Sequence, residues 1–369
     1  HLRFPEFHGE WEKCKLGDIA TLTKGSGISK DQRSATGTPC ILYGELYTTY
    51  KSEVINYVVS KTDISDKNLV RSCANDIIIP SSGETAIDIS TARCVLSPDV
   101  LLGGDLNIIR LKDGDGRFFS YQLNGVRKYD IAKIAQGVSV VHLYGESIKG
   151  LTVSFPSNKE QQKISTLLSL IDERIATQSK LIEMLESLIK GIRHNIFKDI
   201  LGEVLALSNI ADIYQPQTIS SSDLTTEGYW VYGANGIIGK YKEYNHETEQ
   251  ICITCRGNTC GTVNYTRPKV WITGNSMVIN TDKYQQQVNK RFLLHYLSSY
   301  NFKSIVSGSG QPQIVRTPLE KIKVVLPTIE KQVRIANSID IVSEKINTES
   351  SVLKLLENQK QYLLRQMFI

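Results

Sequence analysis

Apolar residues recur every three or four positions in two long segments of this chain, and the second segment repeats the pattern of the first 171 positions later. The apolar positions are Ile164, Leu168, Ile171, Ile175, Ile182, Leu185, Ile192 and Ile196, followed by Ile335, Ile339, Val342, Ile346, Leu353, Leu356, Leu363 and Met367. Apolar residues spaced about 3.5 positions apart form the seam of a coiled coil. The pattern therefore predicts two long helices, over about 158–200 and 329–369, that each bury one face against another helix.

The segments that precede the two helices are duplicated as well, although the distance between matching residues varies. Matching segments are 16–20 with 207–211, 43–44 with 232–233, and 77–85 with 251–259, at offsets of 191, 189 and 174. They are short runs bounded by glycine and polar residues, which is typical of β-strands and their turns. The sequence therefore predicts two globular domains, over 1–157 and 201–328, that share their strands and differ in their loops.

The expected fold is α+β, with an internal pseudo-twofold repeat of two α/β domains separated by the two long helices. We expect the helices to pack against each other as an antiparallel coiled coil, because each seam needs a helical partner. Gln178 and the equivalent Glu349 interrupt the seams near the middle of the helices. These two polar side chains are therefore expected to face each other and to set the helix register.

Some apolar side chains of the helical segments lie outside the seams, so each helix carries more apolar surface than a two-stranded coil requires. The globular domains can cover part of this surface, and partner proteins can cover the rest. The candidate partner-binding residues are Leu167, Leu181, Leu188, Val352, Leu355 and Leu364.

The composition is that of a folded protein without a membrane segment. A hydrophobic content of 41% over 369 residues is sufficient for two domain cores. No apolar run approaches the roughly 18 residues of a membrane helix, and the charged N-terminal stretch does not resemble a signal peptide. The odd number of cysteines, seven, argues against a disulfide framework. We therefore expect a cytoplasmic protein in a reducing compartment, with no membrane partner.

One group of cysteines raises the question of a metal site. Cys252, Cys255 and Cys260 could form a structural zinc site if His246 supplied the fourth ligand. However, Cys252 lies within an apolar run that is predicted to be a strand, where a small buried thiol is common. The sequence therefore favours no metal site.

The search for catalytic motifs finds no phosphate-binding loop, dinucleotide-binding turn, zinc-peptidase helix or serine-hydrolase elbow in the sequence. It also finds no Asp/Glu-x-Lys tripeptide of metal-dependent nucleases and no Asn/Asp-Pro-Pro-aromatic loop of amino-methyltransferases. We therefore expect no catalytic residues. An active site assembled from residues far apart in the sequence is the enzymatic alternative.

Polar, glycine-containing loops in each predicted domain can donate hydrogen bonds to phosphates and to base edges. These loops are Thr21–Ser29, Tyr43–Tyr50, Ser81–Ile87 and Gln136–His142 in the first domain, and Tyr214–Ser222, Tyr232–Lys240, Cys255–Tyr265 and Ser307–Arg316 in the second. The candidate DNA-binding residues are Lys24, Ser26, Tyr43, Tyr47, Ser82, Thr85, Ser139, Gln217, Tyr232, Asn235, Lys240, Arg256, Asn258, Thr259, Ser309, Gln311, Gln313 and Arg316.

Arg256 is the only cation of the Cys255–Thr259 loop, and it aligns with Ser82 in the first domain. We therefore expect this position to distinguish the targets of the two domains. The net charge of +5 is a mild indication of a polyanionic partner. Polar loops occur on every protein, so surface loops without a nucleic-acid function remain the alternative.

The starts of the two helical segments carry the features of a known family. Residues 160–164 after Pro156, repeated as 331–335 after Pro327, resemble the duplicated conserved regions of type I restriction-modification specificity subunits. The second copy departs from the first at Lys331 and Val333, which replace glutamate and glutamine. The opening and closing stretches, 2–7 with Trp11 and 16–19, and 363–369, are similar to that family as well.

The resemblance implies that the globular domains are target recognition domains, which read the two halves of a bipartite, non-palindromic site in double-stranded DNA. It implies two methyltransferase (modification) subunits and restriction (motor and nuclease) subunits as partners, in defence against foreign DNA. The chain itself would be a non-catalytic recognition subunit without a bound cofactor, and S-adenosylmethionine, ATP and Mg would belong to the partner subunits. The alternative is a non-enzymatic scaffold that presents two protein-binding domains without nucleic acid.

Overall fold

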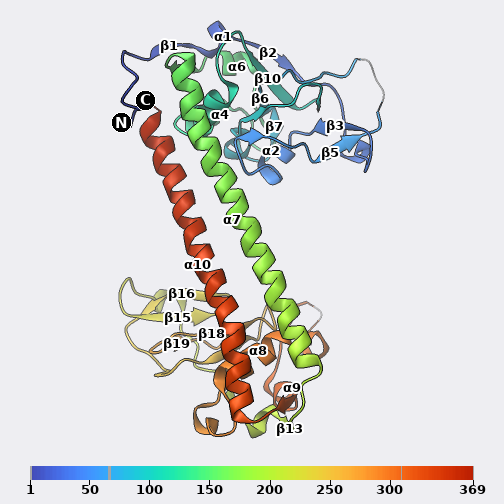
Figure 1. Cartoon of the computed structure of the whole chain (residues 1–369), viewed down its shortest axis with the longest axis vertical. Helices are drawn as coiled ribbons and strands as arrows, with labels where there is room; N and C mark the ends of the chain where they lie inside the picture. Colours follow the sequence, from blue (N-terminus) through green and yellow to red (C-terminus); the bar gives the residue numbers. More distant parts are fainter. Residues whose placement is uncertain (1, 65–67, 309, 369) are drawn as a thin grey trace. The chain divides into compact units, whose positions relative to one another are not determined.

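The computed structural model describes residues 2–64, 68–308 and 310–368. The chain divides into two compact units, of which unit 1 comprises residues 1–179 and 351–369 and unit 2 comprises residues 180–350. Two long helices, α7 (Asn158–Lys198) and α10 (Ile329–Met367), each contribute to both units (Figure 1). Each unit therefore combines a sheet-containing globule with one part of each long helix.

The globule of unit 1 is built on a five-stranded sheet whose two faces are both buried. The strand order is β2 (Ala20–Lys24), β10 (Leu106–Leu111), β6 (Asp76–Pro80), β8 (Arg93–Val95) and β4 (Val54–Ile55). Successive side chains of a strand point to opposite faces, so Ile77 and Ile79 enter one core while Ile78 enters another. The second core is closed by a sheet of β5 (Ser60–Thr62), β3 (Thr38–Ile41) and β9 (Leu101–Leu102).

The first core is covered by α4 (Gly116–Asn124) and by the parts of α7 and α10 that belong to unit 1 (Figure 1). Phe118 of α4 is buried with Ile164 and Leu168 of α7, and its ring centroid lies 5.1 Å from that of Phe368. Leu364, which the sequence analysis assigned to partner binding, lies in this core and is 3% exposed. The assignment of Leu364 is corrected because the globule, rather than a partner, covers this face of α10.

Unit 1 also contains several short helices. They are α1 (Leu16–Ile19), η1 (Lys30–Gln32), α2 (Glu45–Thr48), α3 (Ala86–Ile89), α5 (Lys128–Ile134) and α6 (Gly145–Lys149). The two described chain ends meet in this unit, because the backbone N–H of Leu2 donates to the carbonyl of Gln366 at 2.8 Å.

Unit 2 repeats most of this topology, with a main sheet of four strands rather than five and with loops of different length. Its main sheet has the order β14 (Asp212–Tyr214), β20 (Ser276–Asn280), β17 (Ile251–Thr254) and β18 (Val263–Tyr265), and its second sheet the order β16 (Gly236–Tyr241), β15 (Tyr229–Gly233) and β19 (Trp271–Ile272). In both units the second sheet contains one parallel pair, β3 with β9 and β15 with β19. The predicted mixed α and β content and its duplication are confirmed.

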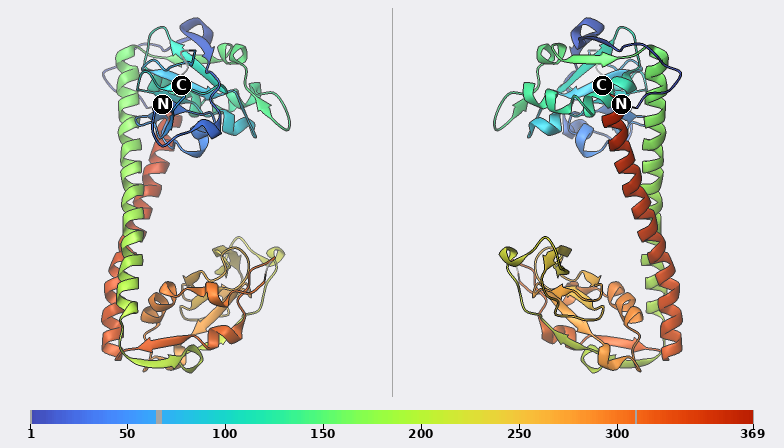
Figure 2. Two further views of the ribbon diagram at one scale, coloured as in Figure 1. Left: turned by 90° about the vertical axis from the view of Figure 1, so that its right-hand side faces the viewer. Right: turned by 90° about the vertical axis from the view of Figure 1, so that its left-hand side faces the viewer.

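The helices of unit 2 follow the same plan. They are η2 (Leu207–Asn209), η3 (Ser221–Asp223), η4 (Asp282–Tyr284), α8 (Lys290–Ser299), η5 (Phe302–Ile305) and α9 (Arg316–Glu320). α8 lies beside the parts of α7 and α10 that belong to this unit (Figure 2). The ring centroids of Phe292 on α8 and Phe197 on α7 are 5.6 Å apart, as Phe118 and Phe368 are paired in unit 1.

Each long helix starts from a two-stranded ladder. β1 (Glu12–Lys15) pairs with β12 (Thr152–Phe155) before α7, and β13 (Glu203–Ala206) pairs with β21 (Lys323–Leu326) before α10. A buried glutamine follows each ladder. Gln161 donates to the carbonyl of Pro156 at 2.8 Å, and Gln332 donates to that of Pro327 at 2.9 Å.

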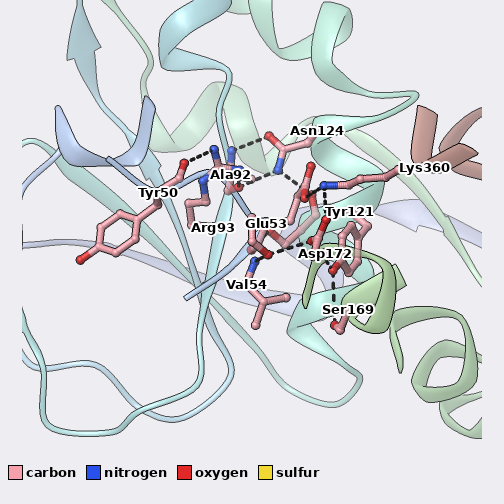
Figure 3. Close-up of polar contacts among 12 residues, drawn as sticks. Tyr50, Glu53, Val54, Ala92, Arg93, Tyr121, Asn124, Ser169, Asp172 and Lys360 are labelled. Carbon is pink, nitrogen blue, oxygen red and sulfur yellow. Dashed lines mark hydrogen bonds and ion pairs between the residues drawn. The ribbon is translucent and has the colours of Figure 1, made fainter. Parts of the chain in front are cut away.

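A buried ion network joins the globule of unit 1 to both long helices (Figure 3). The ammonium group of Lys360 on α10 lies 2.6 Å from the carboxylate of Asp172 on α7 and forms a second ion pair with Glu53. The hydroxyl groups of Tyr121 and Ser52 each donate to Asp172 Oδ2 at 2.8 Å. The three charged side chains are at most 10% exposed, so each charge relies on its partners rather than on water.

A comparable network occurs in unit 2. Asp340 of α10 accepts hydrogen bonds from Arg291 at 2.6 and 3.0 Å and lies 2.7 Å from His295 Nε2, both on α8. Arg193 of α7 contacts the other ring nitrogen of His295 at 3.1 Å. In the described parts of the chain, no helix has the length and apolarity needed to cross a membrane.

Replacing Lys360 by methionine should destabilise unit 1 by about 3–5 kcal/mol, because it leaves the buried carboxylates of Glu53 and Asp172 without a cation. The free energy of unfolding from urea titrations measures this effect. Lys354, which is exposed on the same helix, provides the control, and its replacement by methionine should change stability by less than about 0.5 kcal/mol. Equal effects of the two substitutions would contradict the role of the network.

Candidate nucleic-acid interface

In unit 1, two of the predicted loops border one hollow. Its volume is about 1120 Å³, and its lining includes Gly27 of the loop Thr21–Ser29 and Tyr43 of the loop Tyr43–Tyr50. Lys30 and Arg33, which lie on and directly after η1, also line it. The sequence analysis missed these two cations, although they follow a polar loop and occur just before the next strand.

The other two predicted loops of unit 1 are joined by a short ladder. β7 (Ser82–Gly83) pairs with β11 (Val141–His142), so that Ser82 lies opposite His142. Gln136 and His142 exchange backbone hydrogen bonds of 2.9 and 2.7 Å, which closes the loop around the exposed Ser139. Polar residues far apart in the sequence thus gather at one edge of the globule.

The candidate residues of unit 1 differ in how available they are for a ligand. Lys24 ends β2 with an exposed side chain, and Tyr43 is 36% exposed beside the hollow. Ser26 Oγ accepts a hydrogen bond from the N–H of Val70 at 2.6 Å, so it holds its own loop in place. Thr85 caps α3, because its hydroxyl oxygen accepts from the N–H of Asp88 at 3.1 Å. Burial raises the pKa of the half-buried Tyr47.

In unit 2, three of the predicted loops come together around a hollow of about 330 Å³, whose lining includes Gln215, Arg256 and Gln313. The backbone of Arg256 bridges to that of Gln313, and the N–H of Gly257 donates to the carbonyl of Pro312 at 2.9 Å. This arrangement corresponds to the β7–β11 ladder of unit 1, so Arg256 occupies the place of Ser82. Gln311 is exposed, and Ser309 lies outside the described residues.

The two arginines of this hollow have different surroundings. Arg316 Nε is 2.7 Å from the carboxylate of Glu320, one turn further along α9. Arg256 is exposed, and within the described ranges it has no ion pair with an acidic side chain. Its guanidinium group is therefore available to a ligand, whereas that of Arg316 is partly engaged.

The fourth predicted loop of unit 2 is the turn of the β15–β16 hairpin. Asn235 accepts a hydrogen bond from the hydroxyl of Thr259 at 2.5 Å, which ties this turn to the loop of Arg256. The ammonium group of Lys240 lies 4.9 Å from the ring centroid of Trp230. Tyr232 is 8% exposed within a core cluster, so it is corrected from a binding candidate to a core residue, because β15 turns this side chain toward β17 and β20.

The remaining candidates of unit 2 lie on the surface. Asn258 is exposed beside Arg256. Gln217 has an exposed side chain, and its backbone carbonyl accepts a hydrogen bond from the indole N–H of Trp271 at 3.3 Å. The loop of Gln217 is thereby attached to the second sheet.

A buried histidine orients Tyr214, which also lines the hollow of unit 2. Asn245 Oδ1 accepts from the N–H of Ile272 at 2.9 Å, so it accepts from His246 Nδ1 at 2.6 Å as well. The other ring nitrogen, Nε2, then accepts from the hydroxyl of Tyr214 at 2.8 Å. Burial lowers the pKa of His246 to about 4, which keeps the imidazole neutral and able to accept this bond.

The cysteines considered for a zinc site lie on different sides of the main sheet of unit 2. Cys252 packs in the cluster that contains Tyr232 and Val278, whereas Cys255 packs in the cluster that contains Phe292. Burial raises the pKa of Cys252 to about 12, so its thiol is protonated at neutral pH. Across the described residues, no three His, Cys, Asp or Glu side chains form a group that could hold a metal ion.

Comparison with known proteins gives matches along almost the whole chain. The family model described as "Type I restriction modification DNA specificity domain" matches residues 8–187 and 202–358. The type I restriction enzyme MjaVIII specificity subunit of Methanocaldococcus jannaschii is 24% identical, and the alignment covers 98% of this chain and 94% of that protein.

Two solved structures have a similar fold. The S subunit of a type I restriction-modification system from M. genitalium has a TM-score of 0.70 at 20% identity, with 99% of this chain and 98% of that chain covered. A chain from a structural study of complex assembly and conformational transition of the type I R-M system has a TM-score of 0.56 at 14% identity, with the same coverage of 99% and 98%.

Titration of His246 should make unit 2 less stable in mild acid. The folded pKa of about 4 lies below the value of 6.5 for an unperturbed histidine, so the unfolded chain binds the proton first as the pH falls. The stability contributed by neutral His246 is therefore present above pH 6.5 and is lost toward pH 4, by up to roughly 3 kcal/mol.

Urea unfolding followed by tryptophan fluorescence measures this pH dependence, since Trp230 and Trp271 both lie in unit 2. The His246→Gln variant should show a flatter dependence between about pH 4 and 6.5 than the parent chain. The exposed His194 provides the control substitution, His194→Gln. An unchanged slope in His246→Gln would contradict the assignment.

Proposed function

We propose that this chain, which belongs to the type I restriction modification DNA specificity domain family, reads the two halves of a bipartite site in double-stranded DNA. Specificity subunits of type I systems are recognised as non-catalytic DNA-recognition components, so the expectation that the chain is not an enzyme is confirmed by its family. Each globule reads one half of the site, and the bases between the halves are not contacted.

This proposal rests on one observation: the two units share a scaffold but carry different side chains at its polar edge, the loops around Ser82 in unit 1 and Arg256 in unit 2. The β7–β11 ladder of unit 1 corresponds to the isolated bridges of Gln313 with Arg256 and Ser307 in unit 2, and Arg256 stands where unit 1 has Ser82. Arginine donates two hydrogen bonds to the acceptor pair of guanine, and serine cannot replace it. Two copies with different edges therefore read different half-sites, and the whole site is not a palindrome.

The surface chemistry of the hollows supports DNA rather than another ligand. Arginine and amide side chains line both hollows, and the hollow of unit 1 adds Lys30 beside the acidic Glu45 and Asp105. Arginine, lysine and amide groups are usual donors to phosphates and to base edges in the major groove. The net charge of the chain is +5, which has the sign that a polyanion attracts.

The partner proteins are those of a type I system, two methyltransferase (modification) subunits and restriction (motor and nuclease) subunits. One solved structure with a similar fold comes from a study of the assembly of such a complex, which supports partner subunits in general. In this proposal S-adenosylmethionine, ATP and Mg are bound by the partners, and this chain directs where they act. No cofactor is assigned to this chain.

The proposed docking surface for the methyltransferases lies on the long helices. Leu181 and Leu188 on α7 are 36% and 51% exposed, and Leu355 on α10 is 67% exposed. Met184, which was not among the residues predicted from the sequence, is 61% exposed and lies between Leu181 and Leu188 on α7. Leu167 packs partly against the core of unit 1, and Val352 is half-buried, so both contribute less.

The long helices are proposed to pack against each other as an antiparallel coiled coil. The ion pair between Lys360 of α10 and Asp172 of α7 supports this packing within unit 1. The pairing of Gln178 with Glu349 as the central polar pair that sets the register stays a prediction. Glu349 is buried and also forms an ion pair of 2.5 Å with Lys345.

The alternative, a protein-binding scaffold without nucleic acid, predicts a different salt dependence. Fluorescence anisotropy at several salt concentrations measures the binding constant K for duplex DNA. A plot of log K against log salt concentration should have a slope of about −0.9 for each neutralised phosphate. Absence of salt-dependent binding to any duplex would favour the scaffold. Methyl transfer to DNA by the isolated chain with labelled S-adenosylmethionine would contradict a non-catalytic role.

Replacing Arg256 by alanine should relax base selection in one half-site only, with a loss of discrimination of roughly 1–3 kcal/mol at one position. Arg256→Lys keeps the charge but loses the paired donors, so it should relax selection as well. Lys269→Ala, which removes an exposed charge from the same unit, is the control. Selection of bound duplexes from a randomised pool measures the preference, and an unchanged preference in Arg256→Ala would refute this role.

Replacing Leu188 by aspartate should weaken docking of one methyltransferase, because it places a charge in the centre of a buried apolar contact. Co-purification should yield two methyltransferase subunits for each parent chain and fewer for the variant. Ser187→Asp adds the same charge at a neighbouring exposed position and should leave the ratio unchanged. A stable final complex with one methyltransferase for each parent chain would argue against the docking model.

Replacing both Gln178 and Glu349 by leucine should raise the melting temperature while loosening the helix register, because a buried polar pair selects the register at some cost in stability. Calorimetry measures the melting temperature, and spin labels on the two helices measure the spread of distances between them. A lower melting temperature together with an unchanged distance distribution would contradict the register role.

A further inference from the structure

An arginine of unit 1 occupies a place on the duplicated scaffold where unit 2 has an apolar residue. In unit 1, the N–H of Ser29 donates to Gln32 Oε1 at 2.8 Å at the start of η1, and Arg33 follows directly. In unit 2, η3 starts with the same capping box, formed by Ser220 and Asp223, and the residue that follows is Leu224. The capped turn of η1 is thus repeated as η3 in unit 2, but the arginine that follows η1 is replaced by leucine after η3.

The acidic partner of Arg33 is also confined to unit 1. Glu45 follows Tyr43-Gly44, and the matching Tyr232-Gly233 of unit 2 is followed by Ala234. Leu224 of unit 2 packs on the hairpin instead, where a Cβ on Gly239 would stand 3.0 Å from its Cδ1. The same scaffold therefore forms with leucine and alanine, so the fold does not require this charged pair.

The carboxylate of Glu45 is buried and forms an ion pair with Arg33. Glu45 is 7% exposed, and its oxygens accept hydrogen bonds from the N–H of Leu42 at 2.9 Å and from the hydroxyl of Ser60. Arg33 Nη1 lies 3.7 Å from Glu45 Oε1, and Arg33 Nε donates to the carbonyl of Lys30 at 3.2 Å. Such donors offset the cost of removing a carboxylate from water.

The outer part of Arg33 faces the hollow. Its side chain is 40% exposed and lines the hollow of about 1120 Å³ together with Tyr43 and Thr48. Within the part of the chain that the structure describes, Arg33 Nη2 has no acceptor. The guanidinium group is therefore held through Nε and Nη1, while Nη2 and the second hydrogen of Nη1 can donate to a ligand.

We propose that Arg33 is a specificity-determining residue of unit 1, which reads the acceptor edge of a guanine in its half-site, and that Glu45 is its positioning residue. This inference rests on the proposed function of the chain as a DNA reader. Arginine is suited to guanine because its paired donors match the O6 and N7 acceptors. The two units thus carry their discriminating cations at different places on one scaffold, Arg33 beside η1 in one and Arg256 beside the loop ladder in the other.

Selection of bound duplexes from a randomised pool, with the full chain and its partner subunits, tests the proposal. Arg33→Ala should reduce the preference for guanine at one position by roughly 5- to 150-fold and leave the other half-site unchanged. Arg33→Lys should restore charge but not the preference. Lys13→Ala removes an exposed cation of β1, which does not line the hollow, and serves as the control that should leave the preference at every position unchanged.

A double-mutant cycle separates positioning by Glu45 from a purely structural role. Glu45→Gln should relax the same position as Arg33→Ala and add little to it in the double variant, because both changes affect one interaction. A structural role of Glu45 would instead weaken binding to all sequences alike and add to the effect of Arg33→Ala. Circular dichroism and the melting temperature establish that each variant is folded.

Two results would overturn the inference while leaving the proposed function intact. The first is an unchanged sequence preference in Arg33→Ala while Arg256→Ala relaxes the other half-site. The second is uniformly weaker binding of Arg33→Ala to every sequence with a salt slope reduced by about 0.9, which indicates a phosphate contact. A parent chain that selects no sequence at all would overturn both the inference and the proposed function.

Discussion

One buried glutamine amide ties each globule to the start of the long helix that follows it, and the same arrangement is used twice. Gln161 donates to the carbonyl of Pro156 and accepts from the N–H of Asp115 at 3.0 Å, while Gln332 donates to that of Pro327 and accepts from the N–H of Asn289 at 2.8 Å. Asp115 and Asn289 are the N-caps of α4 and α8. A neutral amide can satisfy both of these helix starts without the cost of burying a charge. These bonds connect the start of α7 to that of α4, and the start of α10 to that of α8.

This attachment allows the polar edge of each globule to vary without loss of the fold. The framework of strands, α4 or α8 and the helix starts carries most of the buried apolar area, whereas Ser82, Arg256 and their neighbours lie on loops outside it. Charged residues at the edge, such as Arg33, need only local partners. Surface substitutions away from such partners change stability little, so a different base preference can arise from few changes.

The sequence predicted the framework better than the edge, for a physical reason. Local periodicity in the sequence predicts the apolar seams of α7 and α10 and the duplicated strands. It shows which side chains are buried, but it does not show which element buries them. Leu364 was therefore assigned to a partner although α4 covers it, and Tyr232 was assigned to a ligand although it is a core residue.

At the candidate interface, all eight predicted loops contribute to a hollow or a loop ladder or are tied to one by a side-chain bond. Arg33 and Glu45 were missed because their contact joins residues twelve positions apart across a turn, and no pattern in one sequence marks such a pair. Thr85 is the N-cap of α3, but in the sequence it cannot be distinguished from a polar loop residue. Geometry rather than residue type separates these roles.

Unit 1 is formed by two separate segments of the chain, so it cannot complete its core until the second segment has been synthesised. Unit 2 is one continuous stretch, 180–350, whereas unit 1 needs residues 351–369 to complete its core and to supply Lys360. At 5–20 residues per second, the ribosome takes roughly 10–40 s to make the chain between the first and second parts of unit 1. During that interval the core of unit 1 lacks Leu364, Met367 and Phe368, so this core is completed only after residues 351–368 emerge.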